Sequence, residues 1–147
     1  MNREVLITLR GTQSMAQEAP ETVELVTPGR MTGRNGKYAI SYEETELTGT
    51  KGVKTTFLTF NPKRAVLTRQ GAIESRMVFE EGTKDESLYQ MGEGCLLLGV
   101  HTRMVQADLS DSGGRIFIDY TVSVEQSSIS DNSYELLIEP AGTETAE

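Results

Sequence analysis

The chain has 147 residues and a formal net charge of −8 at pH 7, with 14 Lys and Arg against 22 Asp and Glu. This length suits one domain, and no apolar run approaches the roughly 18 residues of a membrane-spanning helix. Residues 1–10 carry three charged side chains and no apolar stretch of signal-peptide length. We therefore expect a single cytoplasmic domain that does not contact a membrane.

The charge is distributed unevenly along the chain. Residues 1–74 hold 10 basic and 8 acidic side chains, whereas residues 75–147 hold 4 and 14. An acidic protein lacks the electrostatic footprint of non-specific phosphate binding, which excludes nucleic acid as the expected partner. A short basic strip in the first half is interpreted as solvated strand edges and turns. Its members are Lys51, Lys54, Lys63, Arg64 and Arg69.

The chain has one cysteine, Cys95, and one histidine, His101. An intramolecular disulfide is therefore excluded, which fits a reducing compartment. On one extended strand the two side chains would lie about 20 Å apart, too far for a Cys–His nucleophile pair. We expect Cys95 to be a small buried hydrophobe and His101 to lie on the surface beside Arg103. No metal and no cofactor is expected, because no second histidine or cysteine completes a ligand set.

In the first half, apolar residues repeat with period two between glycine and proline breaks, which predicts half-buried β-strands. The segments that show this pattern are 4–12, 22–27, 37–44, 52–60 and 64–70. Pro28-Gly29 predicts a turn or bulge, and Asn35-Gly36 predicts a tight hairpin turn.

The second half continues the alternation over residues 73–80, 96–104, 116–125 and 134–138. The strand 96–104 is expected to place one set of side chains on a single face: Leu96, Leu98, Val100, Thr102 and Met104. Residues 84–91 are either a strand or a short helix, because Asp85 and Glu86 are indifferent strand formers. The small, acidic residues 141–147 are expected to be a disordered tail.

These nine or ten short strands include no helix long enough for a βαβ crossover. We therefore predict an all-β fold over residues 1–140, a single closed antiparallel barrel of 8–10 strands in an up-and-down meander. Closure is favoured over an open sheet because it leaves no unpaired strand edge. A barrel of this size is either filled by side chains or holds one small ligand.

Short motifs support this fold by resemblance. They are YAISYEETEL (38–47), RQG (69–71), RMVFE (76–80), GCLLLGVHT (94–102) and GRIFIDY (114–120). Their order and spacing resemble the YwiB-like family of uncharacterised bacterial proteins, over roughly residues 3–139. The resemblance implies a calycin-type, lipocalin-like barrel and no assigned activity.

The acidic run 43–46 is the first candidate for a functional site. On a strand, Glu44 and Glu46 share a face with Tyr42. The interpretation favoured by the rarity of buried carboxylates is that both glutamates are solvated at the barrel rim. In the alternative, Glu44 lies inside and requires a partner, for which Arg69 is the natural candidate.

The leading functional hypothesis is a non-enzymatic module that binds a small amphipathic or anionic ligand in the barrel. The candidate ligand-binding residues are Tyr42, Glu44, Arg69, Tyr89, Thr102 and Tyr120. Arg69 is expected to bind the acidic end of the ligand, or Glu44 when the site is empty. The expected apolar lining is Leu98, Val100, Ile118 and Phe79.

Two alternatives remain open. A barrel with a packed interior would act as a homodimer, covering the apolar side chains Leu6, Leu58 and Phe60 that the alternation places outside. A weak enzyme would use the same Glu, Arg and Tyr cluster, although spacing alone reveals no nucleophile–base pair. We assign no catalytic residue.

Overall fold

The described part of the chain is built of β-strands. The computed structural model describes residues 2–15, 18–34, 36–44, 52–124 and 127–141. The strands are β1 (Asn2–Ser14), β2 (Glu21–Arg34), β3 (Lys37–Glu43), β4 (Val53–Asn61), β5 (Arg64–Gly71), β6 (Ile73–Glu80), β7 (Lys84–Met91), β8 (Gly94–Ser110), β9 (Gly113–Val124) and β10 (Ser127–Pro140). Residues 84–91 are thus a strand and not a short helix. In these ranges, no helix is long and apolar enough to cross a membrane.

The ten strands close into one barrel. Each strand pairs with its neighbours in sequence, and β1 also pairs antiparallel with β10. This confirms the predicted closed antiparallel meander. At the closing seam, the Ala141 N–H donates to the carbonyl oxygen of Glu4 at 3.0 Å. Asn35 of the predicted turn and residues 142–147 of the predicted tail lie outside the described residues.

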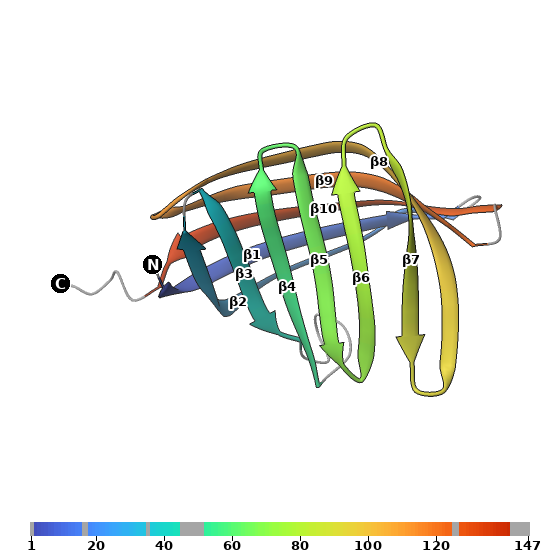
Figure 1. The fold of residues 1–147 in the computed structure, drawn as a ribbon, viewed down its shortest axis with the longest axis horizontal. Helices are drawn as coiled ribbons and strands as arrows, with labels where there is room; N and C mark the ends of the chain where they lie inside the picture. The colour runs from blue at the N-terminus through green and yellow to red at the C-terminus, as the bar shows by residue number, and fades with distance from the viewer. Residues whose placement is uncertain (1, 16–17, 35, 45–51, 125–126, 142–147) are drawn as a thin grey trace.

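Two layers of strands enclose the core. In Figure 1, β3 to β6 cross β1, β9 and β10 at a steep angle, so the barrel is flattened and inward side chains of both layers meet. The predicted inward face of β4 is buried, with Val53, Thr55, Phe57 and Thr59 all in the interior. The largest fully buried side chains are Phe57, Phe79, Ile7, Met31, Ile40, Leu67, Ile116, Ile118, Leu136 and Ile138.

Strand β2 continues through Pro28-Gly29, so the turn or bulge predicted there is wrong. Its register against β1 is unbroken, with Leu6 opposite Pro28 and Val5 opposite Gly29. Pairing with β3 begins only at Arg30, so the proline lies where β1 is the one described neighbour of β2. A Cβ at Gly29 would lie 2.5 Å from Ile7 Cδ1 and 2.6 Å from the Ser41 carbonyl oxygen. The absence of a side chain at Gly29 therefore allows Ile7 of β1 and the backbone of β3 to pack closely against β2.

A β-bulge in β8 changes which residues face the core. Thr102 is opposite Tyr120 and Met104 is opposite Asp119, so one additional residue, Arg103, lies between the two pairs. Met104 is consequently 39% exposed and Val105 is buried. The predicted shared face of Thr102 and Met104 is therefore wrong, because a one-residue insertion reverses the alternation.

The start of β8 extends beyond its described pairing with β9. That pairing begins at Leu98, whereas β7 pairs with β8 from Gly94 and with β6 up to Met91. Cys95 is therefore exposed, which corrects the prediction of a buried cysteine. Leu96 also remains 52% exposed, although its side chain is in phase with the core.

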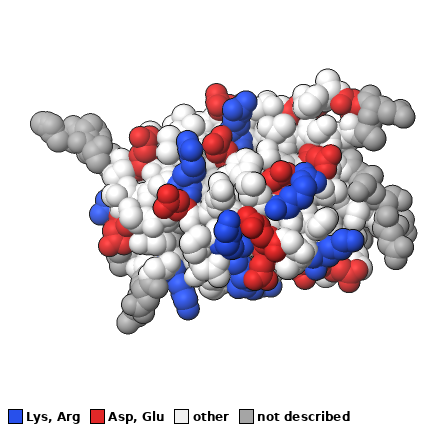
Figure 2. Space-filling view, turned by 90° about the horizontal axis from the view of Figure 1, so that it is seen from above, with Lys and Arg blue, Asp and Glu red and all other residues white. Residues whose placement is uncertain are grey.

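Opposite charges are interleaved on the outer surface. Figure 2 shows basic and acidic side chains next to one another across one face. Arg103 contacts both Asp119, at 2.6 Å, and Asp131, at 3.1 Å. Arg115 lies 3.9 Å from Glu135. This face therefore presents no broad field of one sign.

Gly29→Ala should destabilise the barrel by about 1–3 kcal/mol, because the new methyl group must displace Ile7 or the β3 backbone. Urea unfolding followed by circular dichroism measures the change. Gly11→Ala is the matched control, since a Cβ there would meet Tyr134 at an ordinary 3.7 Å. Equal stability of the two variants would show that the close approach at Gly29 is not required.

Candidate functional site

The site lies at the end of the barrel toward which the odd-numbered strands run. Figure 1 shows β3, β5 and β7 descending toward this end. Because the paired strands around the barrel are antiparallel, β1 and β9 run in the same sense as these strands. We call it the barrel mouth, formed by the last residues of β1, β3, β5, β7 and β9 and the first residues of β2 and β10. Three of the six predicted ligand-binding residues, Tyr42, Arg69 and Tyr89, come from the last residues of β3, β5 and β7, and Glu44 directly follows β3.

A row of polar side chains crosses five strands just inside the mouth. Tyr42 is opposite Thr55, Thr55 is opposite Arg69, Arg69 is opposite Ser75, and Ser75 is opposite Tyr89. Direct cross-strand neighbours lie close enough to interact. We call this row the mouth belt. The Ser75 hydroxyl oxygen is buried and has no hydrogen-bond partner among the described residues.

A buried ion pair anchors the belt. The Arg69 Nε atom lies 3.3 Å from Glu44 Oε2, and the Thr55 hydroxyl donates to the same carboxylate oxygen. The Glu44 side chain is 4% exposed and that of Arg69 is 19% exposed. The favoured expectation of a solvated Glu44 is therefore wrong, and the Arg69 partnership is present. Glu46 lies outside the described residues.

Tyr134 joins the two walls of the mouth and is absent from the predicted set. The Arg69 Nη2 group donates to the Tyr134 hydroxyl oxygen at 3.1 Å. The Tyr134 ring stacks against that of Tyr120, with centroids 6.0 Å apart, and meets the edge of Phe57 at 5.8 Å. Tyr134 alternates in phase with the buried Leu136 and Ile138. This alternation could have identified Tyr134 from the sequence, because the same pattern predicted Tyr42 and Tyr120 to face the interior.

The surroundings keep the phenols neutral and the guanidinium charged. Burial raises the pKa of Tyr42, with further contributions from Tyr134 and Glu44. Burial also raises the pKa of Tyr120, and Tyr134 adds to the effect. For Arg69, burial alone would lower the pKa, but Tyr134 and Glu44 outweigh it and the net shift is upward. At neutral pH the cluster therefore presents hydrogen-bond donors.

An open cavity of about 270 Å³ lies against this cluster. Its lining combines the apolar side chains of Leu9 and Val23 with polar residues that include Tyr120, Asn132 and Tyr134. Gly11 lies directly opposite Tyr134, so no side chain at that position covers the ring. A cavity that combines apolar walls with a few polar groups is typical of a small-molecule site.

Tyr120 is the one predicted ligand-binding residue among the described residues that line this cavity, and Arg69 is connected to the cavity through Tyr134. Tyr89 is half-buried in the mouth belt, and its phenol helps to raise the pKa of Arg69. Thr102 is fully buried opposite Tyr120, and its hydroxyl has no partner in the described part of the chain. The predicted apolar lining belongs to the packed core instead: Leu98, Val100, Ile118 and Phe79.

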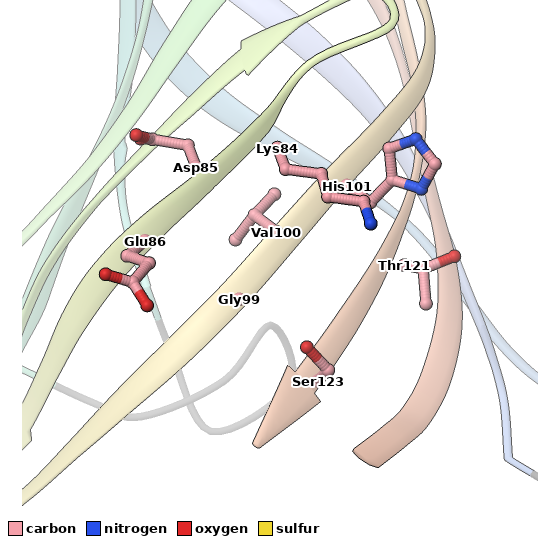
Figure 3. Close-up of a pocket in the computed structure, with 8 residues that line it drawn as sticks. All are labelled: Lys84, Asp85, Glu86, Gly99, Val100, His101, Thr121 and Ser123. Atoms are coloured by element: carbon pink, nitrogen blue, oxygen red, sulfur yellow. The ribbon is translucent and has the colours of Figure 1, made fainter. Parts of the chain in front are cut away.

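A larger open depression of about 790 Å³ lies outside the barrel, on β7, β8 and β9 (Figure 3). Gly99 forms its floor, Lys84 and Glu86 line one side, and His101 lies on the neighbouring strand. His101 is exposed, as predicted, and Figure 3 shows its ring turned away from Ser123. Over the described ranges, no group of His, Cys, Asp and Glu could hold a metal ion.

A double-mutant cycle with Glu44→Gln and Arg69→Met measures the buried pair. Each single substitution should lower the free energy of unfolding by about 1–3 kcal/mol, because it leaves the other member of the pair buried without its counter-charge. The coupling free energy between the two substitutions should be about 1–2 kcal/mol. The exposed Arg115–Glu135 pair is the control and should couple by less than about 0.5 kcal/mol. Equal coupling in the two pairs would contradict the burial argument.

Tyr42 should make the barrel sensitive to alkali. Its pKa is raised above the ordinary 10.0, so the folded state holds this proton longer than the unfolded state does. Its contribution to stability is present below that pH and is lost at higher pH, by up to about 1.4 kcal/mol per pH unit. Urea unfolding at rising pH should therefore show a shallower decline for Tyr42→Phe. Parallel curves would refute this assignment.

Comparison with known proteins agrees with this architecture. The family model described as "Domain of unknown function (DUF1934)" matches residues 7–136. The uncharacterized beta-barrel protein YwiB of Bacillus subtilis (strain 168) is 29% identical over 126 residues, which cover 84% of this chain and 86% of the relative. The crystal structure of the ywiB protein from Bacillus subtilis has a TM-score of 0.78 at 23% identity, covers 92% of each chain and supports the fold. The YwiB-like resemblance is thereby confirmed, and the chain belongs to the DUF1934 family of closed β-barrel proteins of unknown function.

Proposed function

We propose that this protein is a cytoplasmic, non-enzymatic module that binds a small amphipathic molecule at the barrel mouth. The observation that carries the proposal is an open cavity whose polar side is formed by two tyrosines, one of them bound to the buried Arg69. The apolar body of the ligand lies against Leu9 and Val23. Its polar end faces Tyr134.

The ion pair supports a functional role for the mouth. A buried salt bridge contributes little net stability compared with well-packed apolar residues, because both charges must leave water. Most of the other buried side chains are apolar, with hydroxyl groups such as those of Thr59 and Thr102 among them, and this polar cluster lies beside the cavity. Perturbed ionisable groups that line a hollow are typical of binding sites.

The cavity volume suits a small ligand. Its volume of about 270 Å³ is just below the range of drug-sized sites, roughly 300–1,000 Å³. A metabolite-sized molecule fits this space.

The geometry favours binding over turnover. The single histidine lies on the outer face of β8, and the single cysteine lies in the exposed start of the same strand. The described mouth residues include no arrangement in which a base contacts a nucleophilic serine or thiol. The weak-enzyme alternative therefore has no geometric support beyond the cluster itself.

A second candidate is self-association through an outer face. Leu6, Val26 and Leu137 are 39%, 58% and 39% exposed. They lie on adjacent strands, since Thr8 is opposite both Val26 and Leu137 and Leu6 is two residues away. Phe60, the other strongly exposed member of the expected outer set, is partly covered by Arg64, whose guanidinium lies 5.0 Å from the ring centroid.

Native mass spectrometry of gently purified protein tests the binding proposal. We expect an additional small mass that disappears on denaturation and whose identity gives the ligand class. Gly11→Val should reduce its occupancy by filling the cavity opposite Tyr134, and Arg69→Met should reduce it by removing the donor behind Tyr134. Arg115→Met is the control on the outer face and should retain full occupancy.

The same spectra separate the two candidates. Retention of the additional mass in Gly11→Val would place the ligand elsewhere and contradict the mouth as the site. A bare protein at twice the chain mass would favour the homodimer, and Leu137→Glu should then return it to the monomer.

A further inference from the structure

The charge balance of the mouth constrains what it can bind. The positive charge of Arg69 is already matched by Glu44, at 3.3 Å. Among the described residues that line the cavity, Glu21 is the one charged side chain. The molecule as a whole carries a net charge of −8. An anionic ligand therefore meets no uncompensated positive charge here.

Displacing Glu44 would not create a good anion site. Its carboxylate accepts from Thr55 and pairs with Arg69, and its side chain is almost fully buried. A ligand carboxylate that took over Arg69 would leave a second carboxylate buried without its cation, which is strongly unfavourable. A cationic ligand has only the exposed Glu21 as an opposite charge among the described lining residues, and a solvent-exposed ion pair contributes little to binding.

The hydroxyl group of Tyr134 can provide a hydrogen bond to an uncharged ligand in this cavity. Its oxygen accepts the hydrogen bond from Arg69 Nη2 at 3.1 Å. The Tyr120 hydroxyl, whose pKa is raised in part by its hydrogen bond with Tyr134, donates to the same oxygen. A phenol that accepts in this way retains its own O–H proton for donation. Arg69 thus holds Tyr134 at the cavity wall, and the Tyr134 hydroxyl can donate to an acceptor atom of a ligand.

The ring pair adds a preference for shape. Tyr120 and Tyr134 are inclined by only 27°, with centroids 6.0 Å apart, and both line the cavity. Gly11 leaves the Tyr134 ring without a covering side chain at the opposite position. Aromatic faces bind flat rings in offset stacked or edge-to-face geometry.

We propose that the ligand is an uncharged, flat ring compound whose carbonyl or similar acceptor atom receives the hydrogen bond of Tyr134 while its ring lies against Tyr134 and Tyr120. This inference rests on the proposed function and specifies its ligand class. It makes Tyr134 a binding residue and assigns Glu44 the role of holding Arg69 neutralised. It also narrows the range of expected ligands from amphipathic or anionic molecules to uncharged ones, because binding of an acidic group of the ligand to Arg69 is not favoured.

Three probes of nearly equal shape test the charge preference. Near neutral pH, benzamide is uncharged, benzoate is an anion and benzamidine is a cation. Titrations followed by the amide NMR shifts of labelled protein give each dissociation constant. We expect benzamide to bind at least fivefold more tightly than either ion, with the largest shifts around Gly11 and Tyr134.

Two variants separate the contributions of Tyr134 and Glu44. Tyr134→Phe keeps the ring and removes the hydrogen-bond donor, so the affinity for benzamide should fall about three- to tenfold. Glu44→Gln keeps the shape of the side chain and removes its negative charge. The affinity for benzoate should therefore rise at least fivefold, whereas the affinity for benzamide should change little. Arg115→Met is the outer-face control and should leave all three constants unchanged.

The outcomes distinguish this inference from the function on which it rests. If benzoate or benzamidine binds as tightly as benzamide, and Gly11→Val abolishes that binding, the ligand class is wrong while the mouth remains the site. If no probe binds at concentrations up to about 10 mM, the flat-ring class is overturned. Native mass spectrometry then decides the proposed function, because an additional mass lost in Gly11→Val preserves it and a bare protein overturns it.

Discussion

Backbone pairing between β1 and β10 is the constraint on which the rest of the molecule depends. Strand edges present unpaired N–H and C=O groups, and closure removes them by joining the first strand to the last. Once the barrel is closed, alternate side chains of every strand must point inward. The core, the mouth belt and the cavity are all consequences of which residue occupies each inward position.

The interior is divided into two chemical regions. Along most of the barrel the inward positions hold large apolar side chains, such as Phe57, Phe79 and Ile118, which fill the space. Toward the mouth the same faces carry the Glu44–Arg69 pair and the tyrosines. Arg69 connects the layers, because it pairs with Glu44, next to the end of β3, and donates to Tyr134 on β10. The polar region is thereby held rigid beside the open space.

The alternation of apolar residues predicted the fold almost completely. It identified most of the strands and the inward face of β4, because the two-residue period of a strand is a local property. Closure of the barrel was instead predicted from the cost of unpaired strand edges. The same phase placed Tyr42 and Tyr120 inside and suggested Arg69 for Glu44. It failed at Met104, where a single inserted residue reversed the two faces, and at Pro28-Gly29, where neighbouring strands keep β2 extended.

The sequence by itself determined that this chain is a closed antiparallel barrel and which positions can face its interior. The tertiary structure decided which of those positions meet. Arg69 and Tyr134 are 65 residues apart, and only closure of the barrel brings the end of β5 within side-chain reach of β10. The exposure of Cys95 likewise depends on where neighbouring strands end. Burial and contact across a barrel are set by the lengths and crossing of strands, and local periodicity carries no information about either.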